Sequence, residues 1–211
     1  MILFLHAAPV SLAATQAGLE RVRAAFRVRH ALAAGIVDPR AMFFARDASS
    51  YARIRSALSA NVRGDEKRVV LSCSVYNGFA ERLEAEFGVP VERSYDAGSH
   101  AALERGRRIG LAVSYPPSYP VVEAHVQALA RDAGRDLRLV PLLSDNAFSF
   151  ADDSERYARA LLEGVALAGP LETIFLAQYS MDPVAPRIAE ATTIPVVSAL
   201  DATLTRLGVI S

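Results

Sequence analysis

Short apolar runs alternate along the chain with longer stretches in which apolar residues recur at helical spacing. The runs have the length of buried strands and lie at the opening Met-Ile-Leu-Phe-Leu and at 69–71, 108–113, 137–143, 173–177 and 195–198. The helical stretches cover 11–27, 39–60, 79–87, 96–107, 121–133, 154–167, 183–191 and 199–207, whereas 27–34 fits a strand or a helix. We expect Ser11 to cap the first helix. The alternation predicts an α/β protein with parallel sheets covered by helices on both faces.

The pattern also repeats within the chain. At an offset of 105 residues, Val69-Val-Leu-Ser-Cys-Ser-Val superposes without a gap on Ile174-Phe-Leu-Ala-Gln-Tyr-Ser, so that Cys73 aligns with Gln178. At an offset of 107 residues, Ile2, Pro9 and Ser11 fall on Ile109, Pro116 and Ser118. Strand-turn-helix units share composition, so chance similarity is the alternative explanation. Two matched pairs in the same order favour a duplication that gave two related α/β halves.

Composition describes a compact chain and narrows the classes of partner. Its 211 residues are 52% hydrophobic and 22% charged, with 23 Lys and Arg against 23 Asp and Glu. Because there is no net charge and no basic run, we expect no nucleic-acid partner and no anionic membrane partner. The four histidines lack a paired ligand spacing, and one cysteine cannot form an internal disulfide or a Cys-rich zinc site, so we expect no metal.

The apolar opening could be mistaken for a secretory signal. It lacks a basic segment and its apolar core has only four residues, so we interpret it as the first strand. No later stretch approaches the roughly 18 uninterrupted apolar residues of a membrane span. We therefore expect a cytoplasmic protein.

Cys73 is the only cysteine, and it lies at a predicted strand-to-helix junction. A lone intracellular cysteine is commonly a small buried hydrophobic side chain. This position favours chemistry instead, because open α/β sheets place their sites at the carboxyl ends of strands. The N–H groups and dipole of a following helix would stabilise the thiolate, which predicts a reactive thiol with a pKa below about 8.5.

Several short motifs follow one another at a recognisable spacing. They are Leu71-Ser-Cys-Ser74, Gly106-Arg-Arg-Ile-Gly-Leu-Ala-Val-Ser114, Phe175-Leu-Ala-Gln-Tyr-Ser-Met181 and Ile194-Pro-Val-Val-Ser198, after a first strand that ends in a Pro/Ser turn. Together they resemble the aspartate/glutamate/hydantoin racemase superfamily over nearly the whole chain. The resemblance implies two pseudo-symmetric, Rossmann-like parallel-sheet domains with the site in the cleft between them. It also implies that 1–94 and 195–211 form the first domain, and 95–194 the second.

The resemblance further implies a cofactor-independent isomerase that moves a proton at the carbon next to a carboxylate. Cys73 matches the family's first thiol acid/base. Ser74 and Val75 match residues whose backbone donors bind the substrate carboxylate, and Ser114, Tyr115 and Ser118 match a hydroxyl-bearing turn of the other domain. Pro9 and Ser11 match the first-strand loop. His6 lies where some members hold an acidic helper, although a plain strand-end residue is the alternative.

Gln178 departs from the family pattern, because the second base belongs at this position and an amide does not exchange protons usefully at neutral pH. Three interpretations stay open. The first is a racemase or epimerase whose second proton comes from elsewhere, such as His6 or a bound water. The second is a decarboxylase resembling arylmalonate decarboxylase, in which Gln178, Tyr179 and Ser180 would hold a carboxylate or the bound substrate. The third is a ligand-binding relative without turnover.

The sequence leaves the substrate undefined beyond a small molecule that carries a carboxylate. Tyr115 and the loop 144–153, with Phe148 and Phe150, are candidates for shaping its pocket, although core packing is an equal alternative for the two phenylalanines. A homodimer is the common default for enzymes of this size.

Overall fold

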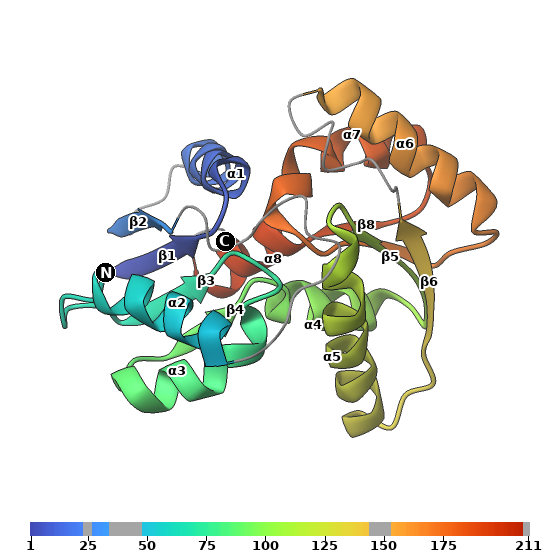
Figure 1. Cartoon of the computed structure of the whole chain (residues 1–211). Coiled ribbons are helices and arrows are strands. Elements are labelled where there is room, and N and C mark those ends of the chain that lie inside the picture. Colours follow the sequence, from blue (N-terminus) through green and yellow to red (C-terminus); the bar gives the residue numbers. More distant parts are fainter. Residues whose placement is uncertain (23–26, 34–47, 144–152, 209–211) are drawn as a thin grey trace.

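The computed structural model describes residues 1–22, 27–33, 48–143 and 153–208, which form two four-stranded parallel sheets. The first sheet has the order β2-β1-β3-β4 and the second β6-β5-β7-β8. Figure 1 shows them side by side, the first half in blue to green and the second in yellow to red. The strands are β1 (Ile2–His6), β2 (Val28–Leu32), β3 (Arg68–Leu71), β4 (Val91–Arg93), β5 (Arg108–Val113), β6 (Arg138–Leu143), β7 (Thr173–Leu176) and β8 (Val196–Ser198).

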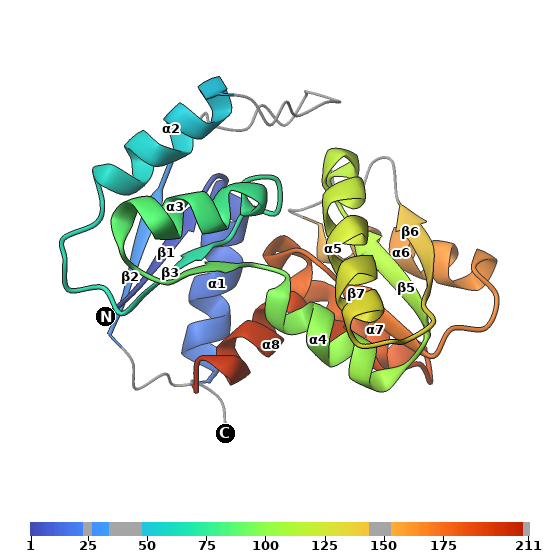
Figure 2. The same ribbon diagram turned by 90° about the horizontal axis from the view of Figure 1, so that it is seen from below.

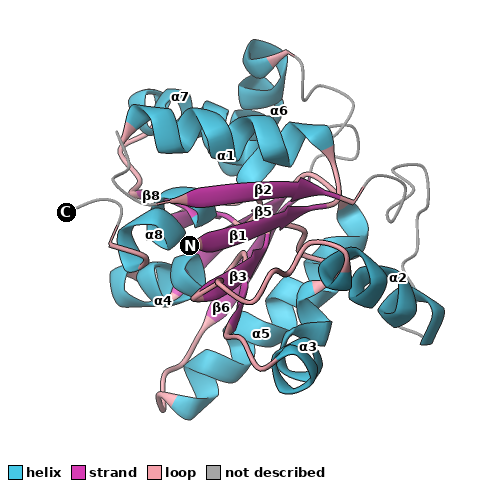
Figure 3. Ribbon diagram, turned by 90° about the vertical axis from the view of Figure 1, so that its left-hand side faces the viewer, coloured by secondary structure: helices cyan, strands magenta, loops and turns pink. Residues whose placement is uncertain are grey.

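Helices flank both sheets, as the alternating pattern predicts (Figure 3). They are α1 (Pro9–Arg21), α2 (Ala48–Ser59), α3 (Ala80–Phe87), α4 (Asp96–Arg105), α5 (Tyr119–Asp132), α6 (Ser154–Leu167), α7 (Ala185–Ala191) and α8 (Ala199–Arg206). Short 3₁₀ turns at Asn77–Phe79, Pro116–Ser118 and Tyr179–Val184 precede α3, α5 and α7. The predicted α/β class is therefore confirmed.

The two sheets confirm the internal repeat. The bounds of β3 and β7 differ by the predicted offset of 105 residues, as do those of β4 and β8, and equivalent strands hold the same place in each sheet order. All pairings are parallel, with β1 and β3 as the inner strands of the first sheet and β5 and β7 as those of the second. Each half is thus one copy of the same four-stranded unit.

The C-terminal segment departs from the domain boundary implied by the resemblance. Val196 pairs with Ile174 and Ser198 with Leu176, so β8 belongs to the second sheet and not to the first domain. The reason is the repeat itself, because β8 follows β7 as β4 follows β3. The helix after it does approach the first half, where Leu200 and Leu204 of α8 pack against Gly18 of α1.

Two helices join the halves. α4 follows the first sheet but packs on α5 and β7 of the second, whereas α8 follows the second sheet and packs on α1 and α4 (Figure 2). One hydrophobic cluster consequently runs through both halves, from Phe4 and Val70 of the first sheet to Leu111 and Phe175 of the second.

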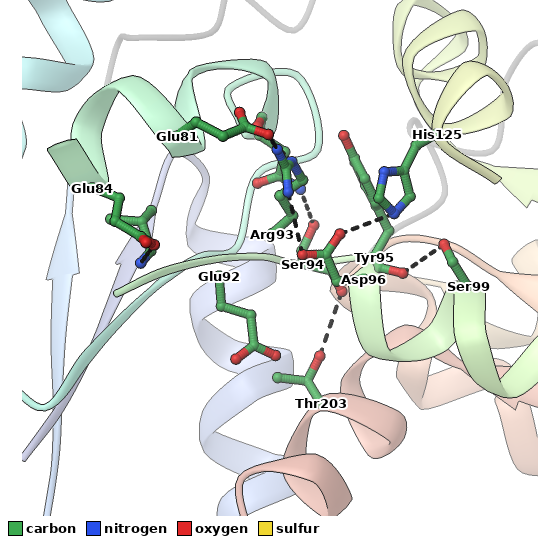
Figure 4. A network of polar contacts seen from close by, with 12 residues as sticks. Glu81, Glu84, Glu92, Arg93, Ser94, Tyr95, Asp96, Ser99, His125 and Thr203 are labelled. Carbon is green, nitrogen blue, oxygen red and sulfur yellow. Dashed lines mark hydrogen bonds and ion pairs between the residues drawn. The ribbon is translucent and has the colours of Figure 1, made fainter. Parts of the chain in front are cut away.

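A polar network fixes the connection from β4 to α4 (Figure 4). The Asp96 carboxylate lies 3.0 Å from His125 Nε2 of α5 and 3.5 Å from Arg93, and Arg93 also pairs with Glu81. Burial alone would raise the pKa of Asp96, but the hydrogen bond and charge of His125, followed by Arg93, lower it. Asp96 therefore remains a carboxylate and ties the connection to the second half.

One local expectation differs from the structure, and one ambiguous stretch is resolved by it. The first helix begins at Pro9, with Ala8 as its N-cap, so Ser11 lies inside it and donates to the Ala8 carbonyl instead of capping it. Residues 28–32, in the ambiguous stretch, form strand β2, which lies at the edge of its sheet. The loop residues Phe148 and Phe150 lie outside the described residues. No described helix has the length and apolar character needed to cross a membrane.

Candidate active site

Cys73 follows β3 directly, at the carboxyl edge of the first sheet, as predicted. The residue keeps some solvent exposure, but protein atoms surround its sulfur. Burial raises the pKa of the thiol to about 11, and the hydrogen bonds from the N–H groups of Val75 and Tyr76 only partly oppose that rise. The expectation of a pKa below 8.5 is therefore wrong, because desolvation outweighs the backbone donors. At pH 7 the thiol is a proton donor.

A small enclosed space, too narrow to hold a water molecule, lies on one side of Cys73. It is formed by the carboxyl ends of β1 and β3 together with α2, and its lining includes His6, Ile54 and Tyr76. Most of the lining is apolar, which explains why the thiol prefers its neutral form.

His6 lines this space and belongs to a buried polar cluster. Its Nε2 lies 2.9 Å from His30 Nδ1, and its Nδ1 lies 2.9 Å from Ser72 Oγ and 3.5 Å from Ser11 Oγ. Burial, followed by the charge of His30, lowers the pKa of His6 to about 3. His6 is therefore a neutral imidazole at physiological pH, with both ring nitrogens in hydrogen-bond contact.

Gln178 lies at the corresponding edge of the second sheet, directly beyond β7 and Ala177. Its Oε1 receives three donors from the turn after β5, namely Ser114 N at 2.6 Å, Ser114 Oγ at 2.8 Å and Tyr115 N at 3.3 Å. Its Nε2 donates to Ser74 Oγ at 3.0 Å and to Ser118 Oγ at 3.1 Å. The side chain thus bridges the two halves.

Ser74 and Ser118 complete this bridge. Ser74 Oγ donates to Ser118 Oγ at 2.9 Å, and both residues are buried. Tyr115, from the second half, packs into the hydrophobic cluster of the first half with Leu71, Val75 and Tyr76. The structure therefore brings together Ser74, Ser114, Tyr115, Ser118 and Gln178, with Cys73 adjacent to Ser74 in the chain.

The remaining predicted residues lie apart from this bridge. Val75 is buried, while Pro9 is exposed at the start of α1. Tyr179 is fully buried, and its hydroxyl donates to Thr203 Oγ1 of α8 at 2.9 Å, which directs it into the core. Ser180 is partly exposed in the following 3₁₀ turn, and Ser11 belongs to the His6 cluster.

Three residues near the site were missed by the sequence reasoning. Ser72 and His30 contact His6, and Tyr157 of α6 lies close to Ser114. Burial raises the pKa of the Tyr157 hydroxyl above its usual range, and Ser114 acts against that rise. Periodicity marks Tyr157 only as a helical residue, so the sequence carries no signal for this contact. In the described ranges, no group of three or more His, Cys, Asp or Glu side chains could hold a metal ion.

The bridge has a clear chemical character. Two backbone N–H groups and one hydroxyl converge on a single acceptor oxygen, which is the arrangement that binds a carboxylate or stabilises an enediolate. A protonated thiol stands in the facing turn, next to the serine that bonds to the amide. Such donors can hold an anionic oxygen, and a protonated thiol can donate a proton.

This architecture is a two-lobed α/β fold with one parallel sheet in each lobe. No family model matches the chain, and no curated protein matches it in sequence, but solved structures share its fold. They include allantoin racemase from Pseudomonas fluorescens, with 18% identity, a TM-score of 0.67 and coverage of 100% of this chain and 93% of that chain. Aspartate racemase from Picrophilus torridus has 14% identity, a TM-score of 0.69 and coverage of 99% and 94%. A mutant of arylmalonate decarboxylase has 13% identity, a TM-score of 0.62 and coverage of 97% and 90%.

These comparisons confirm the predicted fold over nearly the whole chain. The chain has the fold of the aspartate, glutamate and allantoin racemases and of arylmalonate decarboxylase.

Proposed function

We propose that the protein is a cofactor-independent enzyme of the aspartate/glutamate/hydantoin racemase superfamily, in which Cys73 transfers a proton at the carbon next to a carboxylate. The observation that carries this proposal is the pairing of the two turns. The thiol turn after β3 and the three-donor turn after β5 are joined through Ser74, Gln178 and Ser114. The shared fold supports the same class.

The proposed chemistry uses each turn differently. The donors of Ser114 and Tyr115 would hold the substrate carboxylate and stabilise the enediolate as it forms. Cys73 would exchange its proton with the adjacent carbon, and the N–H groups of Val75 and Tyr76 would stabilise the thiolate that results. With a pKa of about 11, on the order of one thiol in 10⁴ is ionised at pH 7 in the free protein. Base catalysis would therefore require substrate binding to favour the thiolate.

Isomerisation needs a proton carrier on the opposite face as well. Gln178 holds that position and cannot supply one, and His6 has both nitrogens engaged by His30 and Ser72. A racemase or epimerase of this kind would use a bound water or a rearranged His6.

A decarboxylase is the second candidate, and the protonated state of Cys73 favours it. Loss of carbon dioxide from a malonate leaves an enediolate that needs one acid and no base. A thiol with a raised pKa is such an acid. Because no second proton carrier is needed, an amide at position 178 is compatible with this reaction.

Deuterium incorporation separates these candidates. The protein would be incubated in deuterated water with amino acids, hydantoins and malonates, and the products analysed by mass spectrometry and chiral chromatography. We expect one-sided labelling: either one enantiomer exchanges its α-proton with retention, or a prochiral malonate gives one labelled enantiomer. Cys73→Ala should lose at least about 10²-fold of the rate. Replacement of Gln178 by Cys should add racemisation.

Three outcomes would overturn parts of this proposal. Labelling that persists in Cys73→Ala would remove the thiol from the mechanism. No labelling with any acid in the panel would leave a ligand-binding protein without turnover. Matched racemisation of both enantiomers by the natural sequence would instead require a second base, and His6 would be the first residue to replace.

A further inference from the structure

The environment of the Gln178 oxygen is unusual for an amide. Three donors within 2.6 to 3.3 Å converge on Oε1, and two of them are backbone N–H groups of consecutive residues in one turn. A neutral carbonyl oxygen is satisfied by two donors, whereas a carboxylate oxygen benefits from each further donor because the bonds are charge-assisted. The donor set is therefore better suited to an anion than to the amide that occupies it.

The nitrogen of the same amide holds the opposite side. Nε2 donates to the buried hydroxyl groups of Ser74 and Ser118, which also bond to each other. One side chain consequently makes five hydrogen bonds, and the one to Ser74 crosses from the second half to the first. As long as they persist, the donors of Ser114 and Tyr115 are occupied, and the hydroxyl next to Cys73 is engaged.

We propose that Gln178 is a specificity-determining gate: a ligand reaches the donors of Ser114 and Tyr115 only by displacing its amide, which selects carboxylates over neutral carbonyl compounds. This inference rests on the proposed function for the identity of the site, and it narrows the substrate class to acids. A carboxylate replaces the amide oxygen by a charged acceptor and gains bond strength. A neutral amide or hydantoin replaces one neutral acceptor oxygen by another and gains no bond strength at the donors of Ser114 and Tyr115. The hydrogen bonds of Nε2 to Ser74 and Ser118 are nevertheless lost.

The gate also couples entry to the thiol turn. When the amide leaves, the hydroxyl groups of Ser74 and Ser118 lose a donor on the side of Cys73. They become free to bond a second polar group of the ligand. Displacement therefore prepares both turns at once, and a ligand with one carboxylate and one further polar group fits this pair of turns.

The test is a binding measurement that needs no turnover. Malonate and hydantoin would be titrated into isotope-labelled protein, and the amide signals of Ser114, Tyr115 and the Gln178 side chain followed by NMR. We expect the natural protein to bind malonate at least about tenfold more tightly than hydantoin. Gln178→Ala should bind both probes about tenfold more tightly, because the competing amide is gone and a larger fraction of the protein is competent to bind.

Gln178→Glu provides the opposite change and guards against a folding defect in the alanine variant. Its carboxylate would occupy the three donors more strongly than the amide, so malonate affinity should fall more than tenfold. Gln16→Ala, on the exposed face of α1, is the matched control and should leave both affinities unchanged.

Equal affinity of the natural protein for malonate and hydantoin would overturn the gate. So would a Gln178→Ala variant that gains affinity for neither probe, or a Gln178→Glu variant that binds malonate as well as the natural protein does. Binding without deuterium exchange would overturn the proposed function while leaving the gate intact. The two ideas therefore fail independently.

Discussion

At the scale of single residues, the protonation state of Cys73 is the property with the largest chemical consequence. Its folded pKa of about 11 lies above the 9.0 of an unperturbed thiol. The unfolded chain therefore loses this proton at lower pH than the folded chain does. The contribution of the thiol to the free energy of unfolding is fully present below about pH 9 and is lost as the pH rises through 11.

We expect alkylation of native Cys73 by iodoacetamide to accelerate about tenfold per pH unit between pH 8 and 10, because only the thiolate reacts. In urea the same profile should level off near pH 9. Rates measured by mass spectrometry across this range provide the test, and Cys73→Ser should lose the part of the alkaline destabilisation that belongs to the thiol. A native rate that is already constant above pH 8 would contradict the raised pKa.

The sequence located Cys73 but could not give its pKa. A strand-end position follows from the apolar run before it, and helix-end donors follow from the turn after it. The desolvating wall comes from distant segments: Leu5 and Ala7 from β1 and the turn after it, Ile54 from α2. Likewise, nothing local to Gln178 shows that its amide bonds to Ser74 and Ser114. The wall around Cys73 depends on how segments of the first half pack, and the bond to Ser74 depends on how the two halves meet. Residues adjacent in the sequence encode neither.

At the scale of elements, the packing of α4 depends on one glycine. A Cβ at Gly98 would lie 2.5 Å from Phe175 Cε2 and 3.0 Å from the Ala199 backbone, both fully buried. Gly164 is also helical, but its Cβ would meet only Leu142, at 4.0 Å. The close approach of α4 to β7 and α8 thus requires the missing side chain in the first case and not in the second.

We expect Gly98→Ala to lower the free energy of unfolding by about 1 to 3 kcal/mol, because Phe175 has no room to move. Gly164→Ala should instead raise it by about 0.4 to 1 kcal/mol through the reduced entropy of the unfolded chain. Urea denaturation of both variants compares the two. Equal effects would mean that α4 does not pack as closely as described.

Element types were predictable where burial was strong. The strands β3 and β7 are fully buried or nearly so, and their apolar runs identify them unambiguously. Strand β2 was ambiguous because it lies at the edge of its sheet, where Val28, Arg29 and His30 are only partly buried. Its sequence therefore mixes apolar and polar residues and lacks a continuous apolar run. Strand β8 was expected at the right place in the sequence, but its sheet could not be predicted because its composition fits either one.

At the scale of the whole molecule, the halves share a core. Residues of β1 and β3 belong to the same buried cluster as residues of β5, α5, β7 and α8, so neither half can bury the apolar surface of this cluster alone. Duplicated halves are often independent units, but here the exchange of α4 and α8 joins them.

We expect thermal unfolding to be a single transition in which the calorimetric and van't Hoff enthalpies agree. A fragment of residues 1–94 should lack a cooperative transition, because it lacks Leu111, Phe175 and Leu200 from the shared cluster. Differential scanning calorimetry and circular dichroism would measure this. Two separable transitions, or a folded fragment, would show that the halves are independent.

The contact of Gly18 with Leu200 has a consequence during synthesis. About 180 residues separate these partners, and at typical elongation rates of about 5 to 20 residues per second the gap lasts roughly 10 to 40 seconds. For that time the small-residue face of α1 has emerged from the ribosome without the helix that covers it. The strands of the first sheet are translated early, but the helix that covers α1 comes near the end of the chain. A nascent chain would therefore present this face of α1 to chaperones until α8 arrives.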